Sequence, residues 1–278
     1  KERLFIINAI NRPITLIVLN RVICTRQASF MTHKTKGIVL RNIRYGETSL
    51  VVTVFTALFG IQVYLVNGAR SAKKTGNKSA MFQPGALLEL DVYHQEQKSM
   101  QRIKECNWMY LYENNLSQVI KNGIVLYMME LLYKTLKQPE EHGDLFDFCE
   151  DALVQLDKAN SSIAANFALF FTLQLTHFFG FKIHHDPRVS YDSAELYIDF
   201  YEGKFVTEQP LHHHYIEGNL AIQTAELLKV MHPDELNQVK LNHQTRKELL
   251  LKYQEYYRLH IPDFGQMKTL QVLHELLS

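Results

Sequence analysis

Cysteine is scarce in this sequence. The chain has three cysteines, Cys24, Cys106 and Cys149, which lie far apart and form no C-x-x-C pair. An odd, scattered set of this kind excludes a disulfide framework and a zinc motif built from cysteine. Unpaired cysteines fit a reducing compartment, which predicts a cytoplasmic protein.

Long apolar runs are missing as well. The most apolar stretch, residues 167–181, is interrupted by Gln174, Thr176 and His177. It therefore falls short of the continuous apolar length that a bilayer-spanning helix needs. We expect no membrane partner for this chain.

The motifs that mark hydrolases, phosphate-binding loops, metalloproteases and dinucleotide-binding folds are absent from the sequence. Only residues 184–186 (HHD) and 212–214 (HHH) cluster groups with metal-ligand chemistry. A zinc site from His177 and residues 184–186 can be imagined, since imidazole and carboxylate suit zinc. Adjacent histidines in a turn are more often solvated, so we predict no metal, no cofactor and no enzymatic activity. A hydrolytic or metal enzyme is an open alternative, and it would need titratable groups gathered in a cleft.

Residues 1–30 do not resemble the rest of the chain. Their apolar run, residues 14–19, is shorter than a signal-peptide core and has no small-residue cleavage site after it. Met31 is followed almost at once by a good strand. We therefore predict that Met31 is the natural start and that residues 1–30 are an extension outside the folded domains. An arginine-rich transit peptide is the alternative.

Charge is divided unevenly along the chain. Residues 31–110 hold eleven Lys and Arg against five Asp and Glu, whereas residues 111–278 hold fourteen against twenty-three. The overall charge of +1 therefore combines +6 for residues 31–110 and −9 for residues 111–278 with +4 for residues 1–30. Such asymmetry predicts that the basic segment contacts a polyanion such as nucleic acid.

The basic segment has the pattern of a small β-barrel. Five runs of alternating or β-branched residues, separated by Gly and Asn-Gly signals, predict strands at 35–41, 50–55, 61–65, 88–92 and 100–106. Gly37 inside the first run suggests a bulge or bend. Five strands without a helix-length segment are typical of the OB barrel, which binds oligonucleotides. We predict an OB-fold nucleic-acid-binding domain at 31–110.

A basic loop lies between the third and fourth predicted strands. Residues 68–79 contain four cations, several small residues and no acid, which favours sequence-independent and salt-dependent phosphate contacts. Tyr45, Tyr64, Phe82 and Tyr93 are candidates for stacking on unpaired bases, although most barrel aromatics belong to the core. The residues that we assign to DNA binding, single- or double-stranded, are Lys34, Lys36, Arg41, Arg44, Tyr45, Arg70, Lys73, Lys74 and Lys78.

The remainder, residues 111–278, is predicted to be a helical C-terminal domain. Apolar residues at three- and four-residue steps indicate helices at about 116–138, 145–156, 163–179, 212–231, 244–258 and 266–277. The third is apolar nearly all round, as expected for a central helix that Gly180 ends. Polar sequence at 182–209 predicts a hairpin insertion. The fold class is therefore α+β: a five-stranded barrel followed by an all-α domain with a small hairpin.

Four short motifs in the basic segment resemble the N-terminal signature of the bacterial RecO recombination mediators. They are residues 34–40 (KTKGIVL), 45–47 (YGE), 53–56 (TVFT) with Gly60, and 67–70 (NGAR). The resemblance implies an OB domain, a helical domain and a role in DNA repair and recombination. That role is to anneal single strands and to help load recombinase onto DNA coated by single-strand binding protein. It also implies a RecR-type partner and a nucleoid-associated place in the bacterial cytoplasm.

The resemblance further implies contact with the acidic tail of single-strand binding protein. Because the helical segment is acidic overall, a groove for that tail must gather cations locally. The candidates are Lys121, Lys134, Lys137, Arg246, Lys247 and Lys252. Many RecO proteins carry four zinc-binding cysteines after the central helix, and residues 182–209 have none, so we expect apolar residues to hold that hairpin. A helical scaffold protein that does not bind DNA directly is the alternative function.

Overall fold

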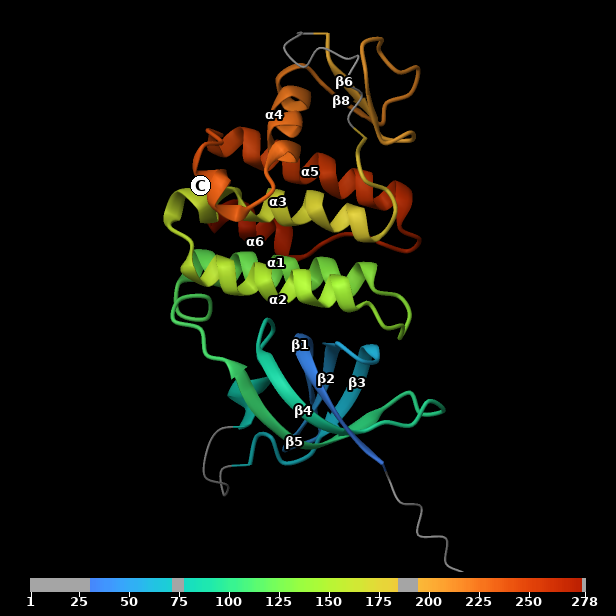
Figure 1. The fold of residues 1–278 in the computed structure, drawn as a ribbon, viewed down its shortest axis with the longest axis vertical. Coiled ribbons are helices and arrows are strands. Elements are labelled where there is room, and N and C mark those ends of the chain that lie inside the picture. The colour runs from blue at the N-terminus through green and yellow to red at the C-terminus, as the bar shows by residue number, and fades with distance from the viewer. Residues whose placement is uncertain (1–30, 72–77, 185–194, 277–278) are drawn as a thin grey trace, which may run out of the picture. The chain divides into compact units, whose positions relative to one another are not determined.

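The first folded element is a closed five-stranded barrel. The structure, a computed structural model, describes residues 31–71, 78–184 and 195–276. The strands are β1 (Thr32–Tyr45), β2 (Ser49–Thr56), β3 (Gly60–Val66), β4 (Leu87–Tyr93) and β5 (Gln101–Tyr110), with a 3-10 turn at Lys78–Phe82 (Figure 1). Their order around the barrel is β1-β2-β3-β5-β4, and only the β3–β5 contact is parallel. This confirms the predicted OB-type barrel.

Strand β1 is longer than predicted, and its middle is buried on both faces. Val39 points into the barrel core, whereas Ile38 and Leu40 belong to the core of the helical segment. Alternate strand residues point to opposite faces, so one strand supplies two cores. The register shift lies between Val39 and Arg41 rather than at Gly37. Gly37 is needed because a Cβ there would lie 2.7 Å from the Leu90 and Val54 side chains.

The second of these cores is shared by the barrel and the helices. Phe55 of β2 is fully buried and its ring centroid lies 5.4 Å from that of Phe146 in the helical segment. A Cβ on Gly60 would lie 2.0 Å from the Glu140 carbonyl oxygen, so the chain after the first helix runs directly over the β2–β3 turn. Residues 31–278 form one compact unit. The division at residue 110 therefore stays a prediction about domains.

The helices pack in layers beside the barrel (Figure 1). They are α1 (Val119–Thr135), α2 (Gly143–Lys158), α3 (Ser161–Phe178), α4 (Gly218–Lys229), α5 (His243–His260) and α6 (Thr269–Leu276). Asn160 caps α3 by accepting from the Ile163 amide, as an N-cap residue should. Most of the side chains of α3 are buried, which confirms its prediction as the central helix.

The segment between β5 and α1 is fastened by one carboxylate. Asp157 of α2 is almost fully buried and accepts hydrogen bonds from the amides of Glu113, Asn114 and Asn115 at 3.0, 2.8 and 2.8 Å. Its backbone carbonyl also accepts from Lys121 Nζ at 2.7 Å. A single residue thus sets the path by which the chain leaves the barrel.

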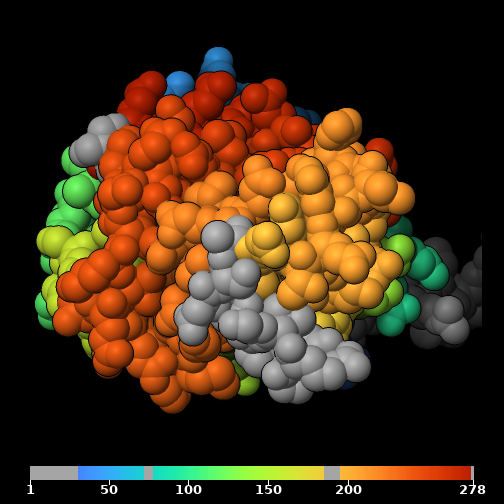
Figure 2. All heavy atoms as spheres, turned by 90° about the horizontal axis from the view of Figure 1, so that it is seen from above, coloured from blue at the N-terminus to red at the C-terminus, as the bar shows by residue number. Residues whose placement is uncertain are grey.

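The predicted hairpin is a three-stranded sheet. Strands β6 (Tyr197–Asp199), β7 (Lys204–Val206) and β8 (Tyr215–Glu217) pair in the order β7-β6-β8. Figure 2 shows this sheet, in light orange, beside the darker orange of α4. The helix predicted from residue 212 was wrong at its start, because β8 occupies 215–217 and α4 begins at Gly218. Leu196, Ile198 and Phe200 are fully buried here, as the prediction of an apolar anchor requires.

Candidate nucleic-acid interface

The outer face of β1, β2 and β3 carries residues in cross-strand rows, of which those on β1 are exposed and those on β2 and β3 are half-buried or buried. Arg41 lies beside Thr53, which lies beside Val63, and Ile43 lies beside Val51, which lies beside Leu65. At the end of the strand, Tyr45 pairs with Ser49. The Tyr45 side chain is 58 % exposed and Ile43 is 46 % exposed. This face, which we call the platform, offers apolar surface and one guanidinium to a ligand.

Cations flank the β1–β2 turn at the end of the platform. Arg44 is exposed, and the backbone of Arg70 is tied to this turn because its amide donates to the Thr48 carbonyl at 2.9 Å. Lys78 is exposed at the start of the 3-10 turn. Burial raises the pKa of the Cys106 thiol on β5, and the charge of Lys78 opposes that shift. Lys73 and Lys74 lie outside the described residues.

Arg41 is positioned by the helical segment. Its guanidinium lies over the Tyr133 ring of α1, with Cζ 5.4 Å from the ring centroid, and Nη1 donates to the Tyr133 hydroxyl at 3.3 Å. Both side chains are exposed. A guanidinium held over an aromatic face keeps its outer face and remaining donors available. Tyr133 was not among the predicted residues, and no local sequence pattern links it to a residue 92 positions away.

Lys34 and Lys36 are placed elsewhere. They occupy the first half of β1, opposite Asp91 and Glu89 of β4. Lys36 Nζ lies 2.9 Å from the Glu150 carboxylate of α2, and that hydrogen bond raises the pKa of Lys36. The structure therefore does not bring these two lysines together with Arg41, Arg44 and Arg70.

Two of the four candidate stacking residues are buried. Tyr64 and Phe82 have no exposed surface and belong to the barrel core. Burial raises the pKa of Tyr64 well above its usual value. Of the candidates, Tyr45 presents its side chain openly.

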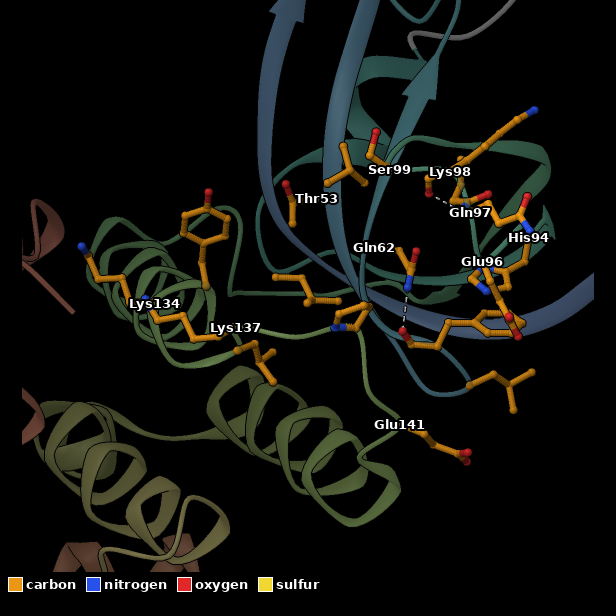
Figure 3. Close-up of a pocket in the computed structure, with 18 of the residues that line it drawn as sticks. Thr53, Gln62, His94, Glu96, Gln97, Lys98, Ser99, Lys134, Lys137 and Glu141 are labelled. Carbon is orange, nitrogen blue, oxygen red and sulfur yellow. Dashed lines mark hydrogen bonds between the residues drawn. The ribbon is translucent and has the colours of Figure 1, made fainter. Parts of the chain in front are cut away.

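A cleft of about 890 Å³ adjoins the platform (Figure 3). Figure 3 shows Thr53 and Gln62 on the strands between two walls, one bearing Lys134 and Lys137 and the other formed by the turn that carries Glu96 to Ser99. Tyr133 and the 44 % exposed Leu58 also line it. Gln62 is turned inward, since its amide donates to the Phe59 carbonyl at 2.8 Å. The cleft thus continues the platform toward the turn between β4 and β5.

The predicted partner cations do not form one group. Lys134 and Lys137 lie at the cleft, where their ammonium groups donate to the carbonyls of Phe264 and Asp263. Lys252 donates to the Tyr215 carbonyl and lies 3.4 Å from Glu255, and Lys247 is half-buried on α5.

Lys121 and Arg246 do come together. They line a hollow of about 430 Å³ with Lys158, Ile120 and the start of α3. Lys121 is 5 % exposed and burial lowers its pKa, so its ammonium lies beneath the hollow rather than on an open surface. Arg246 donates to the Leu241 carbonyl at 2.6 Å, and its buried Nε has no hydrogen-bond partner among the described residues. Lys158 was not among the predicted residues, because it ends α2 and lies far in sequence from Lys121 and Arg246.

The histidines make local contacts. His212 Nε2 lies 3.2 Å from Asp199 and His214 Nδ1 lies 2.7 Å from Glu255. Within the described residues, no three His, Cys, Asp or Glu side chains are grouped so that they could hold a metal ion. His185 and Asp186 of the imagined zinc site lie outside those residues. Likewise, no described helix has the length and apolar character needed to cross a membrane.

A five-stranded barrel in OB order, joined to a helical domain through a shared core, defines a class of nucleic-acid-associated proteins. The family model for the N-terminal region of recombination protein O matches residues 31–112, and the model for its C-terminal region matches residues 116–269. The chain therefore belongs to the RecO family of DNA repair proteins.

Individual relatives agree with this assignment. The chain is 34 % identical over 249 residues to the DNA repair protein RecO of Bacteroides fragilis, covering 89 % of this chain and all of that protein. It is 31 % identical over 248 residues to the protein of the same name from Phocaeicola vulgatus and 33 % identical over 251 residues to that of Flavobacterium psychrophilum, with the same coverage.

Proposed function

We propose that this protein is a recombination mediator that binds DNA on the platform, anneals single strands and helps load recombinase onto DNA coated by single-strand binding protein. Family membership supports the general role. The observation that carries DNA binding is that exposed Arg41, Ile43 and Tyr45 follow one another on the outer face of β1 in an OB barrel. Arg44 is exposed beside the adjoining β1–β2 turn, and the backbone of Arg70 is tied to that turn. This is the strand face that OB folds use for oligonucleotides.

In this proposal, phosphates and bases are contacted by different groups. Arg44, Arg70 and Lys78, with Lys73 and Lys74 of the loop, neutralise phosphates, and Tyr45 stacks on a base. Such contacts position a strand without reading its sequence, which requires bidentate pairing to base edges. We therefore expect little preference between unrelated oligonucleotides.

Replacing Arg44, Arg70 and Lys78 together with alanine should weaken binding to single-stranded DNA and flatten its salt dependence. Each lost phosphate contact removes about 0.7 units from the slope of log K against log salt, so the three should remove about two units. Fluorescence anisotropy of a labelled oligonucleotide at several salt concentrations measures this.

The matched control replaces three other lysines, Lys182, Lys229 and Lys240, with alanine. It should leave the slope of log K against log salt unchanged. An unchanged slope in the arginine and lysine triple variant would contradict the proposed phosphate contacts. If the parent protein showed no oligonucleotide binding at low salt, the alternative of a helical scaffold would be favoured instead.

The hollow at Arg246, Lys121 and Lys158 is our proposed site for the acidic tail of single-strand binding protein. Arg246 and Lys158 line the hollow above the buried ammonium of Lys121, and the lining includes Ile120, which is 45 % exposed, and Ala164 and Ala165. An aromatic-tipped acidic peptide needs both apolar and cationic surface. A RecR-type partner completes the proposed set, and we assign it no residues.

Replacing Arg246 with alanine should weaken binding of a fluorescent peptide with the sequence of that tail by about tenfold, because a guanidinium–carboxylate contact contributes about 1.5 kcal/mol or more. Anisotropy with the full-length chain measures the effect, and Lys229→Ala serves as the control on an exposed helix. Equal affinities for the parent and Arg246→Ala would rule out this hollow as the tail site.

A further inference from the structure

The side chains that line the cleft beside the platform carry no net charge, because Lys98, Lys134 and Lys137 are matched by Glu96, Glu141 and Asp263. Lys134 and Lys137 line one wall with their aliphatic stems, while their ammonium groups donate to the Phe264 and Asp263 carbonyls at 2.9 and 3.3 Å. Leu58, Ile61, Val63 and Tyr133 supply apolar surface. This lining suits bases better than it suits phosphates.

The cleft opens next to Arg41, which Tyr133 of α1 holds in place. Arg41 lies in the same cross-strand row as Thr53 and Val63, which line the cleft, and its guanidinium rests on Tyr133. A strand lying on the platform with its phosphates at the cationic turn would reach Arg41 and Tyr133 with its bases. Arginine planes and tyrosine rings both stack on bases.

From this arrangement we infer that the cleft admits the bases of an unpaired strand and thereby selects single-stranded over double-stranded DNA. The inference rests on the proposed function, because it assumes that DNA lies on the platform. Paired bases are stacked inside a stiff duplex, whose persistence length is about 50 nm, and so they are not available to a cleft between a sheet and a helix. Double-stranded DNA is therefore bound through its phosphates at the β1–β2 turn alone.

The two regions should therefore leave different signatures in solution. Arg44, Arg70 and Lys78 act on phosphates, so their loss affects single strands and duplex alike and lowers the salt dependence. Tyr133 and Leu58 act on bases, so their loss affects single strands selectively and leaves the salt dependence as it was. A tyrosine that merely supported the fold would not separate the two substrates in this way.

The test measures anisotropy of full-length protein with an oligothymidylate of about twenty nucleotides, longer than the site of one OB fold, and with a blunt hairpin duplex. We expect Tyr133→Ala to weaken oligothymidylate binding by about fivefold or more, which corresponds to loss of stacking on one base. Duplex affinity should stay within about twofold, and the salt slope for oligothymidylate should stay unchanged. Leu58→Ala should act in the same direction with a smaller effect.

Tyr133→Phe is the conservative control and should behave like the parent, since it keeps the ring and loses only the hydroxyl. Equal weakening of both substrates by Tyr133→Ala, or no change in either, would overturn the inference. If the Arg44, Arg70 and Lys78 triple variant still lowered binding to both substrates, the proposed function would survive that result. If the parent bound neither substrate, the proposed function and the inference would fail together.

Discussion

Replacing Asp157 with alanine should lower the free energy of unfolding by about 3 to 5 kcal/mol. The buried carboxylate accepts hydrogen bonds from three consecutive backbone amides, and its removal leaves those donors without the partner on which the path out of the barrel depends. Hydrogen bonds to a charged group contribute about 1.5 to 3 kcal/mol, and a buried donor left unpaired adds a desolvation cost.

Chemical denaturation measures this change, with Asp151→Ala as the control. Asp151 lies on the same helix and is exposed, so its replacement should alter stability by no more than about 0.5 kcal/mol. If the two variants were equally stable, the hydrogen bonds to Asp157 would not be what fixes the connection between β5 and α1.

Replacing Phe55 with alanine should destabilise the barrel and the helices together. The side chain is fully buried in the core that they share, and truncating a buried Phe costs about 3 to 5 kcal/mol through lost contacts and the cavity left behind. Because the core is common to both parts, we expect one cooperative transition at a lower denaturant concentration.

Two probes report on the two parts separately. Trp108 is the only tryptophan and lies on β5, so its fluorescence follows the barrel, while far-ultraviolet circular dichroism follows the helices. The transitions should coincide in the parent and in Phe55→Ala, as two-state unfolding requires. Leu58 lies in the β2–β3 turn and is 44 % exposed, so Leu58→Ala should change the denaturation midpoint little. Separate transitions would mean that the shared core does not couple the two parts.

The fold class followed from sequence patterns because alternation and helical periodicity report which face of each element is buried. These patterns predicted the wrong bounds where a strand is mostly exposed or very short. β1 extends beyond the predicted 35–41 because residues 32–34 pair with β4 and residues 42–45 pair with β2, and these largely exposed ends have no alternating burial. β8 was read as the start of a helix because a three-residue strand is too short to show any period.

The site was predictable only in part, since tertiary contacts decide which cations are free. Arg44 lies near the end of β1 and the Arg70 amide donates to Thr48 in the β1–β2 turn, so both belong to one end of the strand, as an OB barrel with a basic loop leads one to expect. Lys36 has the same sequence context but meets Glu150, which is 114 residues away. Lys121 has the sequence pattern of a surface residue on an amphipathic helix. Its ammonium group is nevertheless buried and donates a hydrogen bond to the Asp157 carbonyl. Neither contact can be predicted from the residues near it in the sequence.

The shared core also has a consequence for how the two proposed sites act together. Avidity depends on the effective concentration of the second site once the first is occupied, and a flexible linker between sites dilutes it as the linker lengthens. Here no such linker separates the platform from the hollow at Arg246, because Ile38, Leu40, Phe55 and Leu87 of the barrel are built into the core of the helices. When the hollow holds the tail of single-strand binding protein, the DNA coated by that protein is therefore presented to the platform. The length of the tail alone then sets the effective concentration of that DNA at the platform.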